Sequence, residues 1–549
     1  VFSFTSNLSH LFRKAKGLSF EWHKIPLTTG ISAIAFVLLF GNFDSVIQIY
    51  NMILGEQETF DYWRSTRIVS MVSSGLEINE FPFFTFLFAD LHAHLLSIPM
   101  LISLLSLSFL LYYENSSGSI RLKDLIILLF LALLTGTIKA TNSWDYPLAV
   151  LIVLFSIIML NYYGLGSGRF KFFKSTFYFI FYFLSSIVLF YNFDNSFIMP
   201  EFALSFSNWK TPFLAMIQIL FLPLALFITF AFLYLKNFRN KLKVLYSDFS
   251  ITLNKQIIIF LMIFLTGIIL GIFYQFLTLF ILIITILMIL AIFLIKSKLF
   301  ENDSKLFAWI SLLLFLGLSI PIFTELFVVK NDINRMNTFF KFNFQSWILL
   351  NLAASLLLPF IYYEINNKAQ KYVFIIIISL LTTIGMSYSL YSIKPRISDR
   401  FDNELHSLDG FGYMLNNEYS QKGNMIPLSN SYNAIDWINN NIQGNPVVLE
   451  HSTDLYSWSS RISINTGLPT VLGWDWHQKQ QRSLDSYSVT LRKKHIEEFY
   501  STNSSQYVLD FLNYYNVNMI IYGNIESHSF PDFIKRFESM DIKGIKKIY

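Results

Sequence analysis

Long apolar runs recur along the first 394 residues of this 549-residue chain. An α-helix rises about 1.5 Å per residue, so a run of roughly 16–22 apolar residues can cross the hydrocarbon core of a bilayer. The apolar run from Ile257 to Ile295 is too long for one span, and we divide it near Tyr274 into a tight helical hairpin. We predict about eleven spans, near residues 26–41, 91–112, 124–138, 147–162, 175–191, 213–235, 257–273, 277–296, 307–323, 346–364 and 372–391.

Composition agrees with a polytopic membrane protein. The chain is 54% hydrophobic and only 14% charged, whereas a soluble domain carries about a quarter charged residues. It has no cysteine, which excludes disulfides, iron–sulfur clusters and thiolate zinc sites, so any metal would need His and carboxylate ligands. The formal net charge of +5 is mild and its cations lie in short loops, so it does not indicate nucleic acid binding.

The distribution of Lys and Arg among the loops predicts the orientation. Alternate loops hold about 19 cations on one side of the spans and about 7 on the other, and the richer side is the cytoplasmic one. We therefore expect a protein of the cell membrane with the N-terminus of this chain in the cytoplasm. The poorer, outer side carries Arg64, Arg67, Lys139, Lys210, Lys330, Arg335 and Lys341.

The sequence changes character after Lys394, because short apolar segments begin to alternate with polar helical patterns. The residues 447–450, 470–473 and 519–523 have the composition of buried strands. Helical patterns lie between these strands, as in Leu491 to Tyr500. This alternation is typical of an α/β domain.

We therefore predict a mainly α fold, a polytopic transmembrane helical bundle with a C-terminal extracytoplasmic α/β domain. The bundle would occupy residues 1–394 and the α/β domain residues 395–549, with a hinge in residues 395–402. Both ends are expected to be truncated, since the chain opens on Val1 within a basic stretch and stops in a segment that resembles a strand.

A cluster of ionisable residues precedes the predicted span at 91–112. Asp90, His92 and His94 follow Glu80 in one outer loop, and ionisable groups at a membrane are costly enough to indicate a site. Asp90 or Glu80 would act as a general base. Alternatively Asp90, His92 and His94 would hold a divalent metal such as magnesium or manganese. The structural alternative is that Asp90 caps the helix while both imidazoles lie in the interface.

A second polar segment, which we interpret as an outer loop, runs from Glu325 to Gln345. It carries Arg335, Asn337 and Lys341 among aromatic residues. Arg offers a planar donor fork and Lys a mobile point charge, a combination that suits a lipid-linked phosphate at the membrane surface. The alternative is ordinary anchoring by an aromatic belt with snorkelling cations.

Other outer residues are candidates for substrate binding. Trp144 and Asp145 resemble the aromatic and polar surfaces that bind sugars, although interface anchoring also explains them. Arg67 adds an outer cation, for which a solvated loop charge is the default. In the tail, Trp474 and His477 follow a predicted strand, where ligands commonly bind in such sheets, and a packed turn is the alternative.

Several of these motifs together resemble those of a known family. The strings are Asn42-Phe43-Asp44, Trp63-Arg64-Ser65-Thr66-Arg67, Asn79-Glu80-Phe81-Pro82-Phe83-Phe84, Asp90-Leu91-His92-Ala93-His94, Asn142-Ser143-Trp144-Asp145, Arg335-Met336-Asn337-Thr338, Lys341, and Gly467-Leu468-Pro469-Thr470 with Gly473-Trp474. They look like the YYY family of uncharacterised prokaryotic multi-pass membrane proteins, which resembles the GT-C class of glycosyltransferases. The resemblance covers most of the chain.

The resemblance implies an integral membrane glycosyltransferase that moves a sugar from a polyprenyl-phosphate donor to a glycan or protein acceptor outside the cytoplasm. Asp90 or Glu80 would be base or metal ligand, and Arg335 with Lys341 would hold the donor phosphate. Longer members carry an upstream tyrosine run and another acidic outer loop, so a catalytic carboxylate is also expected there.

Two other functions stay open. One is a transporter or flippase of lipid-linked saccharides, and the other is an assembly scaffold that displays the tail. A transporter needs polar residues near mid-membrane, whereas the segment 257–296 is almost purely apolar. This contrast favours the enzyme.

Overall fold

The computed structural model describes residues 1–18, 24–72, 76–89, 91–114, 119–163, 167–197, 203–245, 266–269, 271, 276–298, 303–330, 333–400, 409–421, 423–481, 486–540, 542 and 544–548. The chain divides into two compact units. The first comprises Val1–Phe197 with Phe202–Asp399, and the second comprises Ile198–Glu201 with Arg400–Tyr549.

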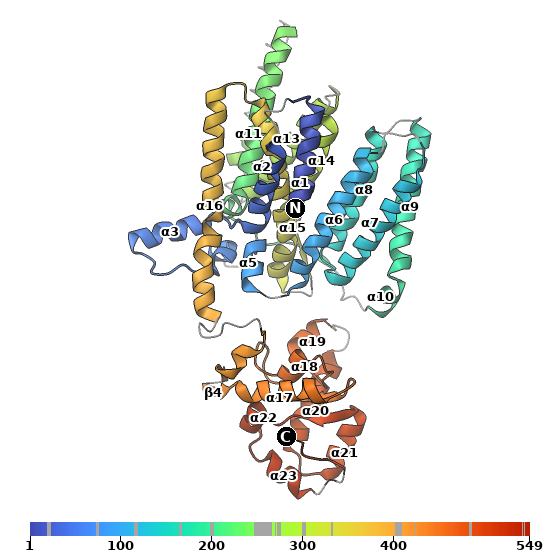
Figure 1. The fold of residues 1–549 in the computed structure, drawn as a ribbon, viewed down its shortest axis with the longest axis vertical. Helices are drawn as coiled ribbons and strands as arrows, with labels where there is room; N and C mark the ends of the chain where they lie inside the picture. The colour runs from blue at the N-terminus through green and yellow to red at the C-terminus, as the bar shows by residue number, and fades with distance from the viewer. Residues whose placement is uncertain are drawn as a thin grey trace. The chain divides into compact units, whose positions relative to one another are not determined.

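The first unit is a bundle of helices (Figure 1). Its long helices are α6 (Ala93–Glu114), α7 (Leu122–Thr141), α8 (Tyr146–Tyr163), α9 (Gly168–Leu189), α11 (Phe213–Leu245), α13 (Leu277–Lys298), α14 (Ser304–Leu326), α15 (Asn334–Glu364) and α16 (Lys368–Arg400). Its shorter elements are α1 (Phe2–Ala15), α2 (Ile25–Ile34), the π-helical turn η2 (Ala35–Leu39), α3 (Asp44–Leu54), the 3₁₀ turn η3 (Arg64–Thr66), α4 (Ile68–Val72), α5 (Pro82–Phe88) and α10 (Tyr191–Ser196). Two short strands, β1 (Leu204–Phe206) and β2 (Phe327–Val329), pair antiparallel.

The prediction of a polytopic bundle is confirmed. Within the described residues, nine helices are long and apolar enough to cross a membrane, and the pair Ile25–Leu39 and Asp44–Leu54, bent by 71°, would make a tenth. These ten coincide with ten of the expected spans. The expected span at 257–273 falls on residues of which only 266–269 and 271 are described.

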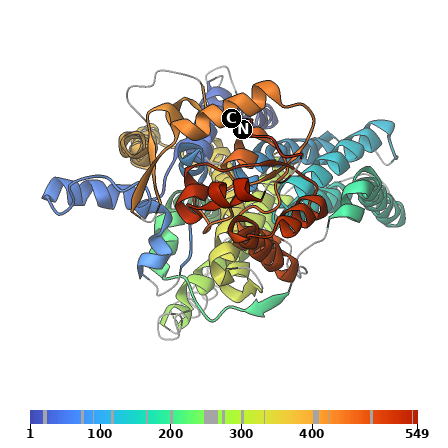
Figure 2. The same ribbon diagram turned by 90° about the horizontal axis from the view of Figure 1, so that it is seen from below.

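The core of the bundle lies along α14 and α15. The apolar window of α15 is 94% buried and that of α14 is 72% buried, against 22% for α9 and for α16. A helix that is apolar all round and buried belongs in the middle of a membrane bundle, whereas an apolar helix with an exposed face meets lipid. Viewed from below, α3 and α9 project from opposite sides of the bundle (Figure 2).

The expected loop at 325–345 is wrong in its secondary structure. Helix α14 continues to Leu326, β2 follows, and α15 begins at Asn334. The first three turns of α15 are therefore formed by residues that look like a polar loop in sequence. The polar residues of these turns include Arg335, Thr338 and Gln345, which are buried and pair with other polar groups of the protein.

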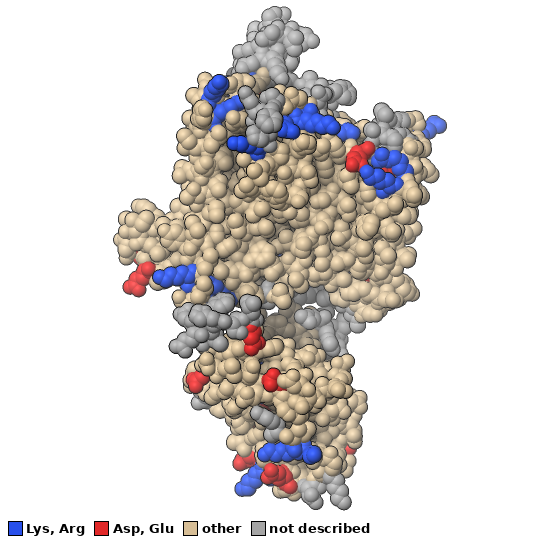
Figure 3. Space-filling model, in the orientation of Figure 1, with Lys and Arg blue, Asp and Glu red and all other residues tan. Residues whose placement is uncertain are grey.

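Lys and Arg gather at one end of the bundle, and a broad belt without charges lies beside them on the face drawn in Figure 3. At this end the buried carboxylate of Asp303 lies 3.0 Å from Lys16 Nζ and 3.3 Å from Lys296 Nζ. These ion pairs join the end of α1, the end of α13 and the start of α14. The starts of α6, α8 and α15 lie at the other end (Figure 1).

The second unit contains a small parallel sheet with helices around it. Strand β5 (Val447–Leu449) pairs parallel with β6 (Val517–Ile520), and Thr470 forms a parallel bridge to Val448. All three predicted strand positions therefore take part in β pairing, the second by this one bridge. The other elements are η4 (Gly412–Leu415), the hairpin β3 (Glu418–Gln421) with β4 (Asn424–Pro427), α17 (Ser429–Asn441), α18 (Arg461–Thr466), α19 (Asp475–Gln481), α20 (Ser486–Ser501), α21 (Ser505–Tyr514), α22 (Asn524–Ser529) and α23 (Phe533–Ser539).

The helix α16 passes through the expected hinge. Pro395 lies inside α16, which continues to Arg400, so the helix does not end at the proline. The two compact units separate between Asp399 and Arg400.

A close approach between η2 and α16 yields the first prediction. A Cβ atom on Gly41 would lie 2.3 Å from Tyr388 Cβ, an atom close to the backbone of a fully buried residue. We expect Gly41→Ala to destabilise the protein by roughly 1–3 kcal/mol, the usual scale of overpacking. Thermal unfolding in detergent would measure this. The matched control is Gly168→Ala at the start of α9, where nothing lies within 4 Å, and equal melting temperatures for the two variants would contradict the close packing.

Candidate functional site

Polar segments that are far apart in sequence meet at the end of the bundle opposite the Lys- and Arg-rich end. The segment before α5 contributes Glu77 and Glu80, the turn before α8 contributes Asp145, and α15 contributes Arg335 and Lys341. Contacts across 200 to 258 residues of sequence join them. The rings of His94 and Phe340, which come from two of these segments, lie 4.9 Å apart.

Arg335 is the most heavily bonded residue of this region. Its Nη1 donates to Glu77 Oε1 at 2.8 Å, and its Nη2 donates to Glu325 Oε1 and to Thr211 Oγ1 at 2.7 Å each. Its Nε donates to the carbonyl oxygen of Thr324 at 3.3 Å. Every nitrogen of a guanidinium that is only 4% exposed thus has an acceptor in the protein.

This arrangement fixes the guanidinium of Arg335 within the protein. We expected its guanidinium to bind a lipid phosphate, but its donors are directed at two buried carboxylates. Glu325 also accepts from the backbone N–H of Thr211 at 3.0 Å and from its hydroxyl. A charge buried in this way is stabilised by its partners rather than held ready for a ligand, so Arg335 positions the start of α15.

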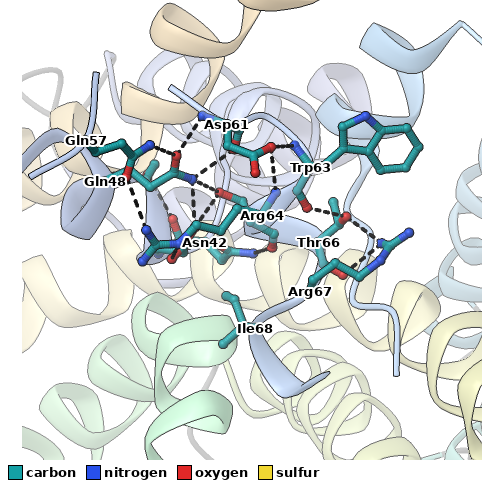
Figure 4. Close-up of polar contacts among 12 residues, drawn as sticks. Asn42, Gln48, Gln57, Asp61, Trp63, Arg64, Thr66, Arg67 and Ile68 are labelled. Carbon is teal, nitrogen blue, oxygen red and sulfur yellow. Dashed lines mark hydrogen bonds and ion pairs between the residues drawn. The ribbon is translucent and has the colours of Figure 1, made fainter. Parts of the chain in front are cut away.

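A second polar network holds the segment between α3 and α5 (Figure 4). Asn42 Nδ2 donates to the carbonyl oxygen of Ser65 at 2.6 Å, and Asn79 Nδ2 donates to the same oxygen at 2.8 Å. Gln48 donates to Asp44 at 2.8 Å, and Arg64 Nε lies 3.2 Å from the Asp44 carboxylate. The motifs Asn42-Phe43-Asp44, Trp63–Arg67 and Asn79-Glu80 are therefore parts of one folded network.

Glu80 and His94 form an acid–base pair beside this network. His94 Nε2 lies 3.5 Å from Glu80 Oε2, and the hydroxyl of Thr85 donates to that oxygen at 3.1 Å. The imidazole is 2% exposed and packs edge-on against Phe340 and Phe344, with ring centres 4.9 and 4.8 Å away. Among the described residues His94 Nδ1 has no hydrogen-bond partner, and Nε2 has only the 3.5 Å contact with Glu80.

The expected metal site is not formed by the described residues alone. The rings of His92 and His94 lie 5.1 Å apart, yet within the described ranges no three His or carboxylate groups lie close enough to hold a metal ion. Asp90, the remaining expected ligand and the expected base, lies outside the described residues. Its roles and the metal stay predictions.

Asp145 is buried at the start of α8. Its carboxylate accepts from the hydroxyl of Ser97 and, at 2.5 Å, from Gln345 Nε2. Burial raises the pKa of Asp145 to about 6, although those hydrogen bonds and the charge of Lys341 act in the opposite direction. This carboxyl group therefore titrates close to neutral pH.

Two cations flank the acid–base pair. Lys341 Nζ lies 4.3 Å from the centre of the Phe340 ring, and its charge acts on both His94 and Asp145. Burial lowers the pKa of Arg67, and the nearby Glu80 carboxylate partly offsets this effect. Arg67 Nη1 donates to the hydroxyl of Thr66 at 2.7 Å.

Two further expected residues lie in the same unit as this group, and two belong to the second unit. Asn337 is half-buried in the second turn of α15, and Trp144 packs edge-on against Phe342 at 5.5 Å. Trp474 and His477 belong to the second unit. Sequence reasoning missed Glu77, Thr211, Ser97 and Thr85, since single polar residues in short connections have no spacing that distinguishes them from loop residues.

The fold and this site define a polytopic membrane protein with a polar, charged region at one end of its helical bundle. The chain belongs to the family described as "Uncharacterized membrane protein (DUF2298)", whose match covers residues 1–350. This supports the expected membership of an uncharacterised multi-pass membrane family. No curated protein matches the chain, and no solved structure matches it.

The buried ion pairs yield a prediction on Arg335. A Lys ammonium is a point charge and cannot bond Glu77, Glu325 and Thr211 together as the fork does. We expect Arg335→Lys to lower the melting temperature in detergent, and Arg335→Met to destabilise the protein by about 3–5 kcal/mol because two carboxylates lose their partner. Lys330→Met, an exposed cation five residues away, is the control. An unchanged melting temperature in Arg335→Met would contradict this structural role and favour a role of Arg335 in ligand binding.

The raised pKa of Asp145 yields a prediction on pH. The carboxyl has an ordinary pKa of 3.8 in the unfolded chain and about 6 in the fold. Its stabilising contribution is therefore complete below the unfolded value and is lost as the pH rises through the folded value. Asp145→Asn stays neutral, so the stability of the wild type relative to this variant should fall across that interval and level off above it. Unfolding in detergent at several pH values would test this, with the exposed Glu58→Gln as control, and a pH-independent difference would contradict it.

Proposed function

We propose that this chain is an integral membrane glycosyltransferase that takes its sugar from a polyprenyl-phosphate-linked donor. The observation that carries the proposal is the pair of Glu80 and His94, 3.5 Å apart, between the cations Lys341 and Arg67 at one end of the bundle. A general base beside cations is what transfer from a phosphate leaving group requires.

The chemistry divides between these residues. The acceptor hydroxyl attacks the anomeric carbon of the sugar, the new C–O bond forms, and the bond from that carbon to the phosphate oxygen breaks. Glu80, oriented by Thr85 and His94, receives the hydroxyl proton. The phosphate leaves with the bonding electrons, and Lys341 and Arg67 stabilise its growing negative charge.

Arg335 supports this site without touching the substrate. Its bonds to Glu77 and Glu325 fix the first turn of α15, and Lys341 lies less than two turns further along the same helix. Asp145 and Gln345, which bond each other, link the start of α8 to that helix. The half-buried Asn337 and Trp144 would contact the sugar.

A metal ion is not required by this scheme. The described donors do not make a three-ligand site, so no step is assigned to magnesium or manganese. If Asp90 lay beside His92 and His94, the three side chains would form the expected metal site. Asp90 would then also be an alternative to Glu80 as the general base.

We infer the orientation from the cations. The end of the bundle with Lys16 and Lys296 is the one we place in the cytoplasm, by the excess of about 19 cations over about 7 in the alternate loops. The site and the second unit would then be extracytoplasmic, in the cell membrane, where a lipid-linked donor meets a glycan or protein acceptor.

The test is transfer of labelled hexose from polyprenyl phosphate. The purified chain, reconstituted in vesicles with membrane extract as the source of acceptor, should release label from the lipid phase into glycan or protein. Glu80→Gln keeps the side chain's shape and should lower the transfer rate by about 10²-fold or more. Lys341→Met should lower it as well, because the leaving phosphate loses a cation, and Asp90→Asn tests the predicted second base.

The controls are Glu58→Gln and Lys330→Met, which change exposed residues of the same types outside the group. Melting temperatures separate lost chemistry from lost folding. Movement of intact lipid-linked sugar across the vesicle bilayer, with no transfer by the wild type, would establish a flippase and overturn the proposal. Full transfer by Glu80→Gln would remove Glu80 from the mechanism.

A further inference from the structure

A pocket of about 390 Å³ lies in the second unit, at the carboxyl end of the segment 470–473. That segment bridges β5 through Thr470 and Val448. The pocket is enclosed by α18, α19 and α20, and the exposed Ile464 lies at its rim. Its volume is within the range of small-molecule sites, and its place matches the edge of a parallel sheet at which ligands bind.

Four polar atoms in the pocket wall have no partner within the described part of the chain. They are Ser460 Oγ, Thr470 Oγ1, Trp474 Nε1 and His477 Nδ1, and all four are buried. Ser460 itself is 5% exposed. Buried polar atoms are almost always paired in folded proteins, so four unpaired ones around one pocket indicate a polar ligand.

Two aromatic rings, Trp474 and His477, line the pocket, and the exposed Tyr456 lies beside them. The centres of the Trp474 and His477 rings lie 5.3 Å apart, and Tyr456 lies 5.6 Å from the first and 5.1 Å from the second. Tyr456 and Ser460 both have left-handed backbone conformations, with φ of 55° and 61°. Such conformations cost about 1 kcal/mol or more in residues other than glycine and are concentrated at functional sites.

The charge of the pocket selects among polar ligands. None of the described residues that line it carries a carboxylate, and its one cation, Arg492, donates to the carbonyl oxygen of Val471 at 3.0 Å. A metal ion would lack ligands, and a phosphate would lack a cluster of cations. Hydroxyl, indole and imidazole groups beside aromatic rings fit a neutral molecule with many hydroxyls.

We propose that this pocket binds a neutral pyranose unit of a saccharide. The apolar C–H face of the sugar would lie against Trp474 and Tyr456, and the sugar hydroxyls would pair with Ser460, Thr470 and His477. Binding here is independent of the transfer chemistry proposed for the first unit, so either proposal can fail while the other holds.

The test uses the full chain in detergent, labelled with 5-fluorotryptophan. Methyl glycosides of glucose, mannose, galactose and N-acetylglucosamine are added at millimolar concentration. At least one of them should shift the ¹⁹F resonance of Trp474, which is assigned by its absence in Trp474→Phe. The resonance of Trp476, an exposed neighbour outside the pocket, should not move.

Affinity measurements on variants complete the test. Trp474→Ala should weaken binding by about tenfold or more, as expected for a central aromatic contact, and Trp476→Ala should not. Ser460→Ala removes a hydroxyl that has no partner among the described residues, so it should keep the melting temperature and still weaken binding. The proposal is overturned if no glycoside moves the Trp474 resonance, or if both tryptophan variants bind equally well.

Discussion

The guanidinium of Arg335, buried between Glu77 and Glu325, is the interaction on which the polar end of the bundle depends. It joins the segment before α5, the end of α14 and the start of α15, which are 258 residues apart at the extremes. Without the guanidinium, the buried carboxylates of Glu77 and Glu325 would each cost several kcal/mol. The arrangement of the three segments therefore depends on all three being present. The helix α15 is also the most deeply buried of the candidate spans in the described residues. The position of its first turn therefore affects the packing of the core around it.

The second unit also contains a buried arginine between two glutamates. Both terminal nitrogens of Arg461 donate hydrogen bonds to the Glu526 carboxylate, at 3.1 and 2.7 Å. Arg461 Nη1 also lies 3.8 Å from Glu450 Oε2. Burial would raise the pKa of Glu526, but Arg461 and backbone donors outweigh it and hold that pKa below its usual range. At Glu450 the effect of burial is larger than the opposing effects of Arg461 and the backbone donors, so the pKa of Glu450 is raised. One arginine between two glutamates thus sets the geometry in each unit, and the second lies next to Ser460 of the proposed saccharide pocket.

The spans could be predicted because their signal is local: a long apolar run has one stable structure in a bilayer. The first turns of α15 could not, because Arg335 and Gln345 pair with Glu77 and Asp145, carboxylates 258 and 200 positions away. Glu80 and His94 were found as a cluster of ionisable residues in one short segment. Glu77, three residues before Glu80, had the same local signal and was missed, since nothing in the sequence shows that it faces Arg335.

Helix geometry explains why Arg335 and Lys341, which look equivalent in sequence, differ in role. Six residues correspond to about 600° of rotation, so the two side chains point about a third of a turn apart. Arg335 faces Glu77, Glu325 and Thr211. Lys341 Nζ instead lies 4.3 Å from the centre of the Phe340 ring, which packs with Phe344 against His94. The buried arginine satisfies its charge within the protein and fixes the helix. The lysine, less than two turns further on, would then hold its charge at the proposed acid–base pair in a defined position.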